Sequence, residues 1–241
     1  YVYKRSGTSW AQEAYIKASN NRADAKWGRI VALDGDTLAV GHWYDKSNQT
    51  TITNDNSSAS TNTSSSESGA VFVYKRTGNN WAQEAYIKAA NSEAGDNFGG
   101  DNSLGLSLDN DTLAVGVPYE DSNQTSITNG TTASSNNSND TAGAVYVYRR
   151  TGTSWAQEAY IKSVYSYSDR QANFGSSVSL DKDTLAVGAH YDNASGRVYV
   201  YKRADNNTWA QEAYINAVNI SGTDFFGYSV ALDNNTLAVG D

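Results

Sequence analysis

The sequence predicts an all-β fold, a β-propeller of four blades with four strands each. Three observations support this prediction. Four short motifs recur in a fixed order along the 241 residues, most of them alternate residue types with period two, and the closest copies of one motif begin 54 residues apart, at Trp155 and Trp209. A period of about 50 residues that contains four short alternating segments is typical of a propeller blade.

The first motif is an aromatic residue and a glycine, followed by an apolar alternation that ends in Leu-Asp. Alternation of this kind predicts a strand with one buried face. The four copies are residues 27–34, 98–109, 174–181 and 226–233, the second with four extra residues.

The second motif is Thr-Leu-Ala-Val-Gly, and it predicts the second strand of each blade. Its copies lie at 37–41, 112–116, 184–188 and 236–240. Two residues, rich in Gly and Asn, separate it from the first strand, as in a tight hairpin with a positive φ. We expect the aspartates before these turns to accept hydrogen bonds from turn amides. They are Asp34, Asp109, Asp181 and Asp233.

The third motif alternates Val with Tyr or Phe and predicts the third strand, at 2–5, 71–76, 145–150 and 198–203. The fourth motif is the nonamer WAQEAYIKA, found at 10–18 and 81–89 and, with one change each, at 155–163 and 209–217. Its Ala, Gln, Glu and Lys favour a helix when the nonamer is read alone. A lone helix would have no matching face among strands, so we interpret the nonamer as the outermost strand of each blade.

In the first copy of the nonamer, strict alternation places one set of residues on the same face of the strand: Trp10, Gln12, Ala14 and Ile16. The tryptophans that open the four nonamers are predicted to pack between blades. They are Trp10, Trp81, Trp155 and Trp209.

The chain begins in the third strand of a blade and ends in the second strand of another. Residues 1–18 would therefore complete the blade begun at 226–240, and the whole blades would be about 27–89, 98–163 and 174–217 within one domain, 1–241. Three arrangements stay open. The two terminal halves close a ring within one chain, they pair with the halves of neighbouring molecules to form a fibre, or the chain is a slice of a larger propeller.

The pattern FGxSVALDxDTLAVGA followed by GAVYVY resembles the FG-GAP repeat, the blade unit of integrin α-subunit heads. The likeness is greatest to bacterial FG-GAP proteins with WxQxAYIKASN between blades, and it covers essentially the whole chain. The resemblance implies an exported β-propeller, outside the cell or on its surface. It also implies a role in adhesion, matrix or surface structure rather than catalysis.

Members of this family often carry a calcium loop of the DxDxDG type between the first two strands. Here each such stretch, for example Leu33–Leu38, has at most two carboxylates. Calcium needs about six to eight oxygen ligands. We therefore expect the usual calcium loop to be lost, and no cofactor is predicted.

Acidic residues follow the second strand of three repeats, next to a tyrosine. The metal-ligand candidates among them are Asp45, Glu120, Asp121 and Asp192. A second set precedes the aromatic-Gly motif and comprises Asp24, Asp96, Asp169 and Asp224. A ring of carboxylates on one propeller face could bind cations or sugars. We favour the simpler interpretation that these acids cap turns and interact with water.

Composition excludes several classes of function. The net charge of −8 argues against nucleic acid and anionic membrane surfaces as partners, and no apolar run approaches the about 18 residues of a membrane helix. Without cysteine, neither disulfides nor thiol catalysis is possible. His42 and His190 are the only histidines. No nucleophile motif accompanies them, so we predict no catalytic residue and no enzymatic activity.

Two long inserts, 46–68 and 122–142, separate the second and third strands of the first two repeats. They are rich in Ser, Thr and Asn, which cannot build a core, and are predicted to be loops. Their N-x-S/T sequons make them candidate glycosylation sites. The sequons are Asn48, Asn56, Asn62, Asn123, Asn129, Asn136 and Asn139.

The near-identity of the repeats favours a structural or surface protein that self-assembles into filaments through the split terminal blade, because diverse ligand sites would need blade tips that differ. The alternative is an adhesin or a lectin-like propeller that binds extracellular protein or glycan through the acid-rich loops. A hydrolase is the weakest of the three hypotheses.

Overall fold

The computed structural model describes residues 1–22, 25–57, 59–100, 103–164, 172–218 and 224–241. Within these residues it contains seventeen β-strands and one short 3-10 turn, η1 (Asp192–Ala194). The all-β prediction is therefore confirmed. No helix in the described part of the chain has the length and apolar character needed to cross a membrane.

Three antiparallel sheets, two of four strands and one of five, form the body of the molecule. The first blade consists of β3 (Trp27–Asp34), β4 (Thr37–His42), β5 (Ala70–Thr77) and β6 (Asn80–Ile87). The second contains β7 (Leu106–Asp109), β8 (Thr112–Val117), β10 (Ala144–Thr151) and β11 (Ser154–Ile161). The third consists of β12 (Ser177–Asp181), β13 (Thr184–Ala189), β14 (Arg197–Arg203) and β15 (Trp209–Ile215).

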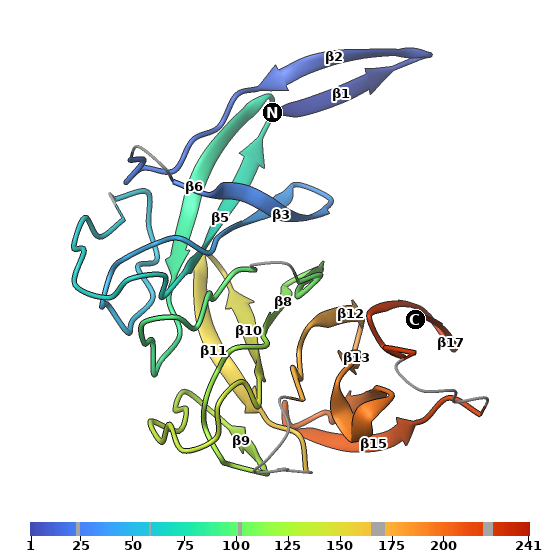
Figure 1. The fold of residues 1–241 in the computed structure, drawn as a ribbon. Coiled ribbons are helices and arrows are strands. Elements are labelled where there is room, and N and C mark those ends of the chain that lie inside the picture. The colour runs from blue at the N-terminus through green and yellow to red at the C-terminus, as the bar shows by residue number, and fades with distance from the viewer. Residues whose placement is uncertain (23–24, 58, 101–102, 165–171, 219–223) are drawn as a thin grey trace.

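A two-stranded hairpin lies at each end of this series. The first pairs β1 (Val2–Ser6) with β2 (Ser9–Ala14), and the last pairs β16 (Ser229–Asp233) with β17 (Thr236–Gly240). The blades follow an arc, and the two termini lie apart (Figure 1). Among the described residues the two hairpins belong to separate sheets, so the chain contains three full blades and two half blades that do not pair with each other.

The nonamer folds as a strand in all four copies, against its local helix propensity. It supplies β2, β6, β11 and β15, each paired with the Val/Tyr strand before it. Tertiary pairing overrides propensity here because every other segment of the blade already presents a strand edge.

Burial follows the number of neighbouring blades. In the central blade Tyr146, Tyr148 and Tyr160 are almost completely buried, whereas Trp10 in the first hairpin is 66% exposed. Tyr86 and Tyr199 in the other two full blades are buried as well, whereas Tyr3 and Tyr15 in the first hairpin are each 55% exposed, because burial of an aromatic ring needs a partner surface.

The glycine that ends the second motif permits close contact between blades. A Cβ on Gly116 would lie 2.0 Å from the carbonyl oxygen of Gly175 in the next blade, and the pair Gly41 and Gly99 would approach to 1.9 Å. Any larger residue would push adjacent blades apart. Two of the four motifs therefore meet each other across the blade interface.

The inserts do more than connect strands. In the second blade β9 (Ile127–Asn129) adds a fifth strand outside β11. In the first blade Thr53 exchanges two backbone hydrogen bonds of 2.9 Å with Tyr86 at the same position. The composition of the inserts predicted loops; the short Ile-Thr run within each is what allows pairing, since β-branched residues suit an edge strand.

Candidate functional site

Each nonamer contains a β-bulge at its glutamate. In β11, Gln157 pairs with Tyr148 and Ala159 with Val147, which leaves Glu158 without a partner in the ladder. The same shift occurs in β2, β6 and β15. A bulge inserts one residue and changes the direction of its side chain. Strict alternation along the nonamer, as predicted from the sequence, therefore does not hold across this glutamate.

The bulged glutamate binds the tryptophan and an arginine of the next blade. Glu84 accepts hydrogen bonds from Trp155 Nε1 at 3.0 Å and from Arg150 NH2 at 2.6 Å. Glu158 accepts from Trp209 Nε1 at 2.7 Å and Arg203 NH1 at 3.3 Å. The nonamer of β11 therefore presents its glutamate to one neighbour and its tryptophan to the other.

The first hairpin makes the same contact with the first blade. Glu13 accepts from Trp81 Nε1 at 3.0 Å and from Arg76 NH1 at 3.2 Å. The Trp81 hydrogen bond, with the Arg76 charge, lowers the pKa of Glu13 despite partial desolvation. Charge-assisted bonds of this kind are about twice as strong as neutral ones.

The hairpin aspartates accept hydrogen bonds from turn amides, but the amides belong to the adjacent blade. Asp34 Oδ2 accepts from Asn110 N at 2.8 Å, and Asp181 Oδ2 accepts from Asn234 N at 2.7 Å. Asp109 accepts likewise from Lys182 N. These aspartates therefore connect successive turns, and Asp109 also accepts from Asn110 Nδ2 of its own turn at 2.9 Å.

Asp45, a metal-ligand candidate, is buried in a network of donors. Its carboxylate accepts from Asn20 Nδ2 at 2.8 Å, Ser47 N at 2.9 Å and Tyr86 OH at 3.0 Å, and Lys88 Nζ lies at 3.4 Å. Burial lowers the pKa of Lys88 to about 8, and the charge of Asp45 opposes this shift. The carboxylate charge is thus balanced within the protein.

Glu120 occupies the equivalent position in the second blade and has the same partners. Its oxygens accept from Tyr160 OH at 2.7 Å, from Asn91 Nδ2 at 3.1 Å and from Lys162 Nζ. The pKa of Lys162 is lowered by burial, against the charge of Glu120.

The third blade keeps this network but takes its cation from another strand. Asp192 accepts from Tyr199 OH and from Arg197 NH1 at 3.2 Å, both on β14. Asn216 stands where the other blades have lysine, and it accepts from Arg197 Nε at 2.9 Å. Burial raises the pKa of Asp192, although Tyr199 and Arg197 oppose the shift. The cation therefore comes from a different position in the third blade, but a buried ion pair is present in all three blades.

The remaining acids lie apart from these pairs. Asp121 Oδ1 accepts from Thr141 N at 2.7 Å, and Asp96 Oδ2 accepts from Glu93 N at 2.9 Å. Asp24 and Asp169 lie outside the described residues. In the described ranges, no three His, Asp or Glu side chains come together as a metal-binding group.

The two histidines lie in different blades. His190 Nδ1 is 2.8 Å from Ser176 Oγ, and its ring packs against Tyr191 with centroids 4.3 Å apart. His42 is buried beside Asp45, with 3.6 Å between Nδ1 and Oδ2. Burial lowers the pKa of both imidazoles, so both rings favour the neutral form.

The sequons differ in how their side chains are used. Asn139 is buried, and Asn129 donates from Nδ2 to the Trp209 carbonyl at 3.2 Å. Asn129 is nevertheless exposed, as are the other five sequons, Asn48, Asn56, Asn62, Asn123 and Asn136.

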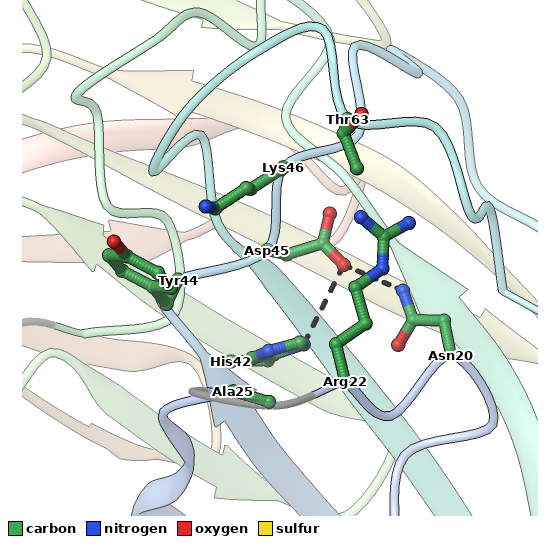
Figure 2. Close-up of a pocket in the computed structure, with 8 residues that line it drawn as sticks. All are labelled: Asn20, Arg22, Ala25, His42, Tyr44, Asp45, Lys46 and Thr63. Atoms are coloured by element: carbon green, nitrogen blue, oxygen red, sulfur yellow. Dashed lines mark hydrogen bonds and ion pairs between the residues drawn. The ribbon is translucent and has the colours of Figure 1, made fainter.

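A pocket of about 210 Å³ lies beside the buried Asp45 of the first blade. We call it the His42 pocket; it is lined by Asn20, Arg22, Ala25, His42, Tyr44, Asp45, Lys46 and Thr63. Figure 2 shows the side chains of Arg22 and Asn20 on one side of Asp45 and those of His42, Tyr44 and Lys46 on the other. The sequence singled out Asp45 and His42 as site residues but not Arg22, nor Asn20 and Lys46, although Asn20 ends the WxQxAYIKASN pattern and Lys46 begins the first insert.

A family model described as the FG-GAP repeat matches residues 10–74, 155–201 and 209–241, more than half of the chain. The chain is also similar to integrin alpha-6 of Gallus gallus, with 35% identity over 117 residues. That alignment covers 43% of this chain and 10% of the integrin, so the chain spans only a small part of that relative.

Proposed function

Because the chain belongs to the FG-GAP repeat family, we propose that it is a non-catalytic, integrin-like binding and structural repeat protein located outside the cell or on its surface. Its repeated motifs support this proposal, since most of them form contacts between blades. Each blade thereby acts as a connector for the next.

We further propose that copies associate head to tail and complete a shared blade. The supporting observation is that the two end blades carry complementary halves of the Trp–Glu contact. Trp10 is 66% exposed and Glu212 is exposed, and within the described residues neither forms the contact that joins the inner blades. A copy's Glu212 would accept the Trp10 indole of the next copy.

The internal blades supply the geometry for this joint. In the third blade Leu185 pairs with Tyr201, so the same register would pair Leu237 in β17 of one copy with Tyr3 in β1 of another. An apolar groove of about 500 Å³ runs between the first hairpin and the first blade, and exposes Val31 and Leu33. The β16–β17 hairpin of the second copy would cover it, as β16 packs on β12 within the chain. An interface that repeats without closing gives a filament.

Sedimentation velocity over a range of concentrations tests this assembly. We expect the unmodified chain to form larger species as its concentration rises. Trp10→Ala should raise the protein concentration at which larger species appear by at least about tenfold. This corresponds to a loss of about 1.4 kcal/mol of binding free energy at the interface. Glu212→Gln should have a smaller effect, because an amide oxygen still accepts from the indole.

Asp205→Asn is the matched control, since Asp205 is an exposed acid in the turn between β14 and β15. It should associate like the unmodified chain. A chain that stays monomeric at every concentration, or a Trp10→Ala variant that associates normally, would contradict the head-to-tail proposal.

Besides Asn129, whose amide bonds to Trp209, five exposed sequons on the inserts support a glycoprotein. Glycopeptide mass spectrometry of material from the native source tests this, and unmodified peptides at all five positions would exclude it.

The second candidate function is an adhesin or lectin-like binding protein. One observation favours it: the His42 pocket lies at a loop where the first and second blades differ in charge, although their frameworks match.

A further inference from the structure

The His42 pocket contains buried polar atoms that no protein group satisfies. His42 is 3% exposed and Asn20 is 5% exposed. Neither ring nitrogen of His42 has a hydrogen-bond partner in the protein, and neither has Asn20 Oδ1. A buried polar group without a partner costs about 1–3 kcal/mol. Both residues line the pocket, so a molecule that enters it can supply the missing bonds.

The lining has an excess of positive charge although the chain carries a net charge of −8. Arg22 and Lys46 contribute two cations, and Asp45 contributes one carboxylate. Lys88, behind that carboxylate, already balances it at 3.4 Å. Arg22 is anchored by hydrogen bonds to the carbonyl oxygens of Thr61 and Asn62. The uncompensated charge of the pocket therefore favours an anion.

The second blade provides an internal comparison. Its framework is the same: Asn91, Glu120, Tyr160 and Lys162 match Asn20, Asp45, Tyr86 and Lys88. Its lining is not. The replacements are Arg22 by Glu93, Ala25 by Asp96, His42 by Val117 and Lys46 by Asp121. The framework that folds the blade is kept while the charge of the loop is reversed, which a purely structural role does not require.

We propose that the His42 pocket binds one anionic sugar residue, carboxylated or sulfated. The acid group would bind to the cations Arg22 and Lys46, which flank the Asp45 carboxylate, and the hydroxyls would bond to His42 and to Asn20 Oδ1. The volume of about 210 Å³ is below the roughly 300–1,000 Å³ of sites for drug-sized ligands, as a site for a single ring should be.

The groups of the pocket match both parts of such a ligand. Arginine binds carboxylate and sulfate through paired N–H donors, and lysine adds a point charge. A neutral imidazole offers one donor and one acceptor, and Asn20 Oδ1 offers a further acceptor, so sugar hydroxyls can be bonded in both directions. Burial, which lowers the pKa of His42, keeps the imidazole in this neutral form.

Titration of the 241-residue chain with glucuronate, glucose 6-sulfate and glucose, followed by NMR, tests the proposal. The chain has only two histidines, so the ring signals of His42 report binding and those of His190 serve as an internal reference. We expect at least one anionic sugar to shift the His42 signals and to bind at least about tenfold tighter than glucose. If glucuronate binds tighter, the pocket prefers a carboxylated sugar; if glucose 6-sulfate binds tighter, it prefers a sulfated one.

Lys46→Asp places the second blade's residue in the pocket and should weaken binding of the anionic sugar by at least about tenfold. Lys46 is partly exposed at the surface and outside the core, so this variant should fold. Lys202→Asp makes the same charge change at an exposed site on β14 and should bind like the unmodified chain.

Three results would overturn the proposal: equal affinity for glucose and both anionic sugars, unaffected binding in Lys46→Asp, or no shift of the His42 signals at about 10 mM of either anionic sugar. The inference is independent of head-to-tail association. Lys46→Asp should leave sedimentation unchanged, whereas Trp10→Ala should leave sugar binding unchanged.

Discussion

Asp96 shows how one side chain can oppose the stability of the fold around it. Its carboxyl is buried, and burial raises its pKa to about 7. The Glu93 N–H opposes this shift, while the negative charges of Glu120, Glu93 and Asp121 add to it. Lys88 and Lys162 interact with the charge of Asp96, but each forms its ion pair with another carboxylate, Asp45 or Glu120.

Replacing Asp96 with Asn should therefore stabilise the protein at alkaline pH. Between about pH 4 and pH 7 the folded state binds more protons than the unfolded chain, so the free energy of unfolding falls as pH rises. The penalty is complete above pH 7 and amounts to at most about 4 kcal/mol. Thermal unfolding of Asp96→Asn should show a higher Tm than the unmodified chain at pH 8 and a similar Tm at about pH 4.

Asp140→Asn is the control for this prediction, because Asp140 is exposed on the second insert. Its Tm should match that of the unmodified chain at both values of pH. If Asp96→Asn raised the Tm by the same amount at both values of pH, the effect would not come from the charge of Asp96.

At this scale the sequence predicted residue types better than their partners. It identified Asp45, Glu120 and Asp192 through their position after the second strand. It did not pair them with Lys88, Lys162 and Arg197, because these cations are supplied by other strands and, in the third blade, by a different one. Contacts across strands depend on register, which a single sequence leaves open.

Among the elements, the bulged nonamer and the insert both form hydrogen bonds to the next blade. Asn54 bonds to both backbone groups of Trp155 in the next blade, with Oδ1 at 2.7 Å from N and Nδ2 at 2.8 Å from O. Asn129 does the same at Trp209, at 2.7 and 3.2 Å. Each insert thus fastens the outer edge of its own blade to the start of the following nonamer.

Removing one of these asparagine side chains should destabilise the contact between two blades. Asn129→Ala loses two hydrogen bonds to the Trp209 backbone, which costs about 1–2 kcal/mol. For a chain of this size that corresponds to a fall in Tm of about 2–4 °C per kcal/mol. Calorimetry gives the fall in Tm, and NMR-detected hydrogen exchange should show faster exchange of the Trp209 amide.

Asn136→Ala is the matched control, since Asn136 lies on the same insert and accepts only from Ser138. It should change Tm by much less. If both variants lower the Tm equally, the insert stabilises the protein through its own fold rather than through the contact with Trp209.

The strands were predictable from the sequence because each has a period-two pattern and turn residues at its ends. The bulge was not, because alternation gives no sign of an extra residue at Glu158. The sequence signal lay elsewhere: four glutamates kept at one position of the nonamer already indicated a shared partner. The edge strand β9 was hidden by the polar composition around Ile127.

For the whole molecule, stability should be greatest at the centre of the arc. The second blade has neighbours on both sides, and its strands β8 and β10 are buried along most of their length. The strands of the first hairpin, β1 and β2, are largely exposed. Local opening costs less where fewer buried contacts are broken.

Hydrogen exchange can measure this gradient with the nonamer as an internal standard. The stretch from Trp to Lys is identical in β2, β6 and β11, so intrinsic exchange rates are alike and differences report structure. In dilute solution, amides of β2 should exchange at least about tenfold faster than those of β11. NMR is the suitable method, because peptides of identical sequence have identical mass.

Raising the protein concentration should slow exchange in β1 and β17 if copies share a blade, while β10 should stay unchanged. Uniform exchange across the three nonamers at low concentration would contradict the gradient.

The repeat period and the order of strands within a blade could be predicted because they are local properties of the sequence. How the ends meet could not, since the same half blades suit a closed ring, a filament or a longer array. The family match covers residues 10–74, 155–201 and 209–241 and leaves the same choice open.

The glutamate–tryptophan contact also bears on how such a chain can evolve. Every nonamer offers the same two halves of one joint, so any copy fits any other, whatever its place in the series. Duplication or deletion of a whole repeat in the gene leaves every remaining joint matched. The number of blades is therefore free to change in one genetic step, whereas the nonamer itself is held constant because a change in one copy affects the joints on both sides.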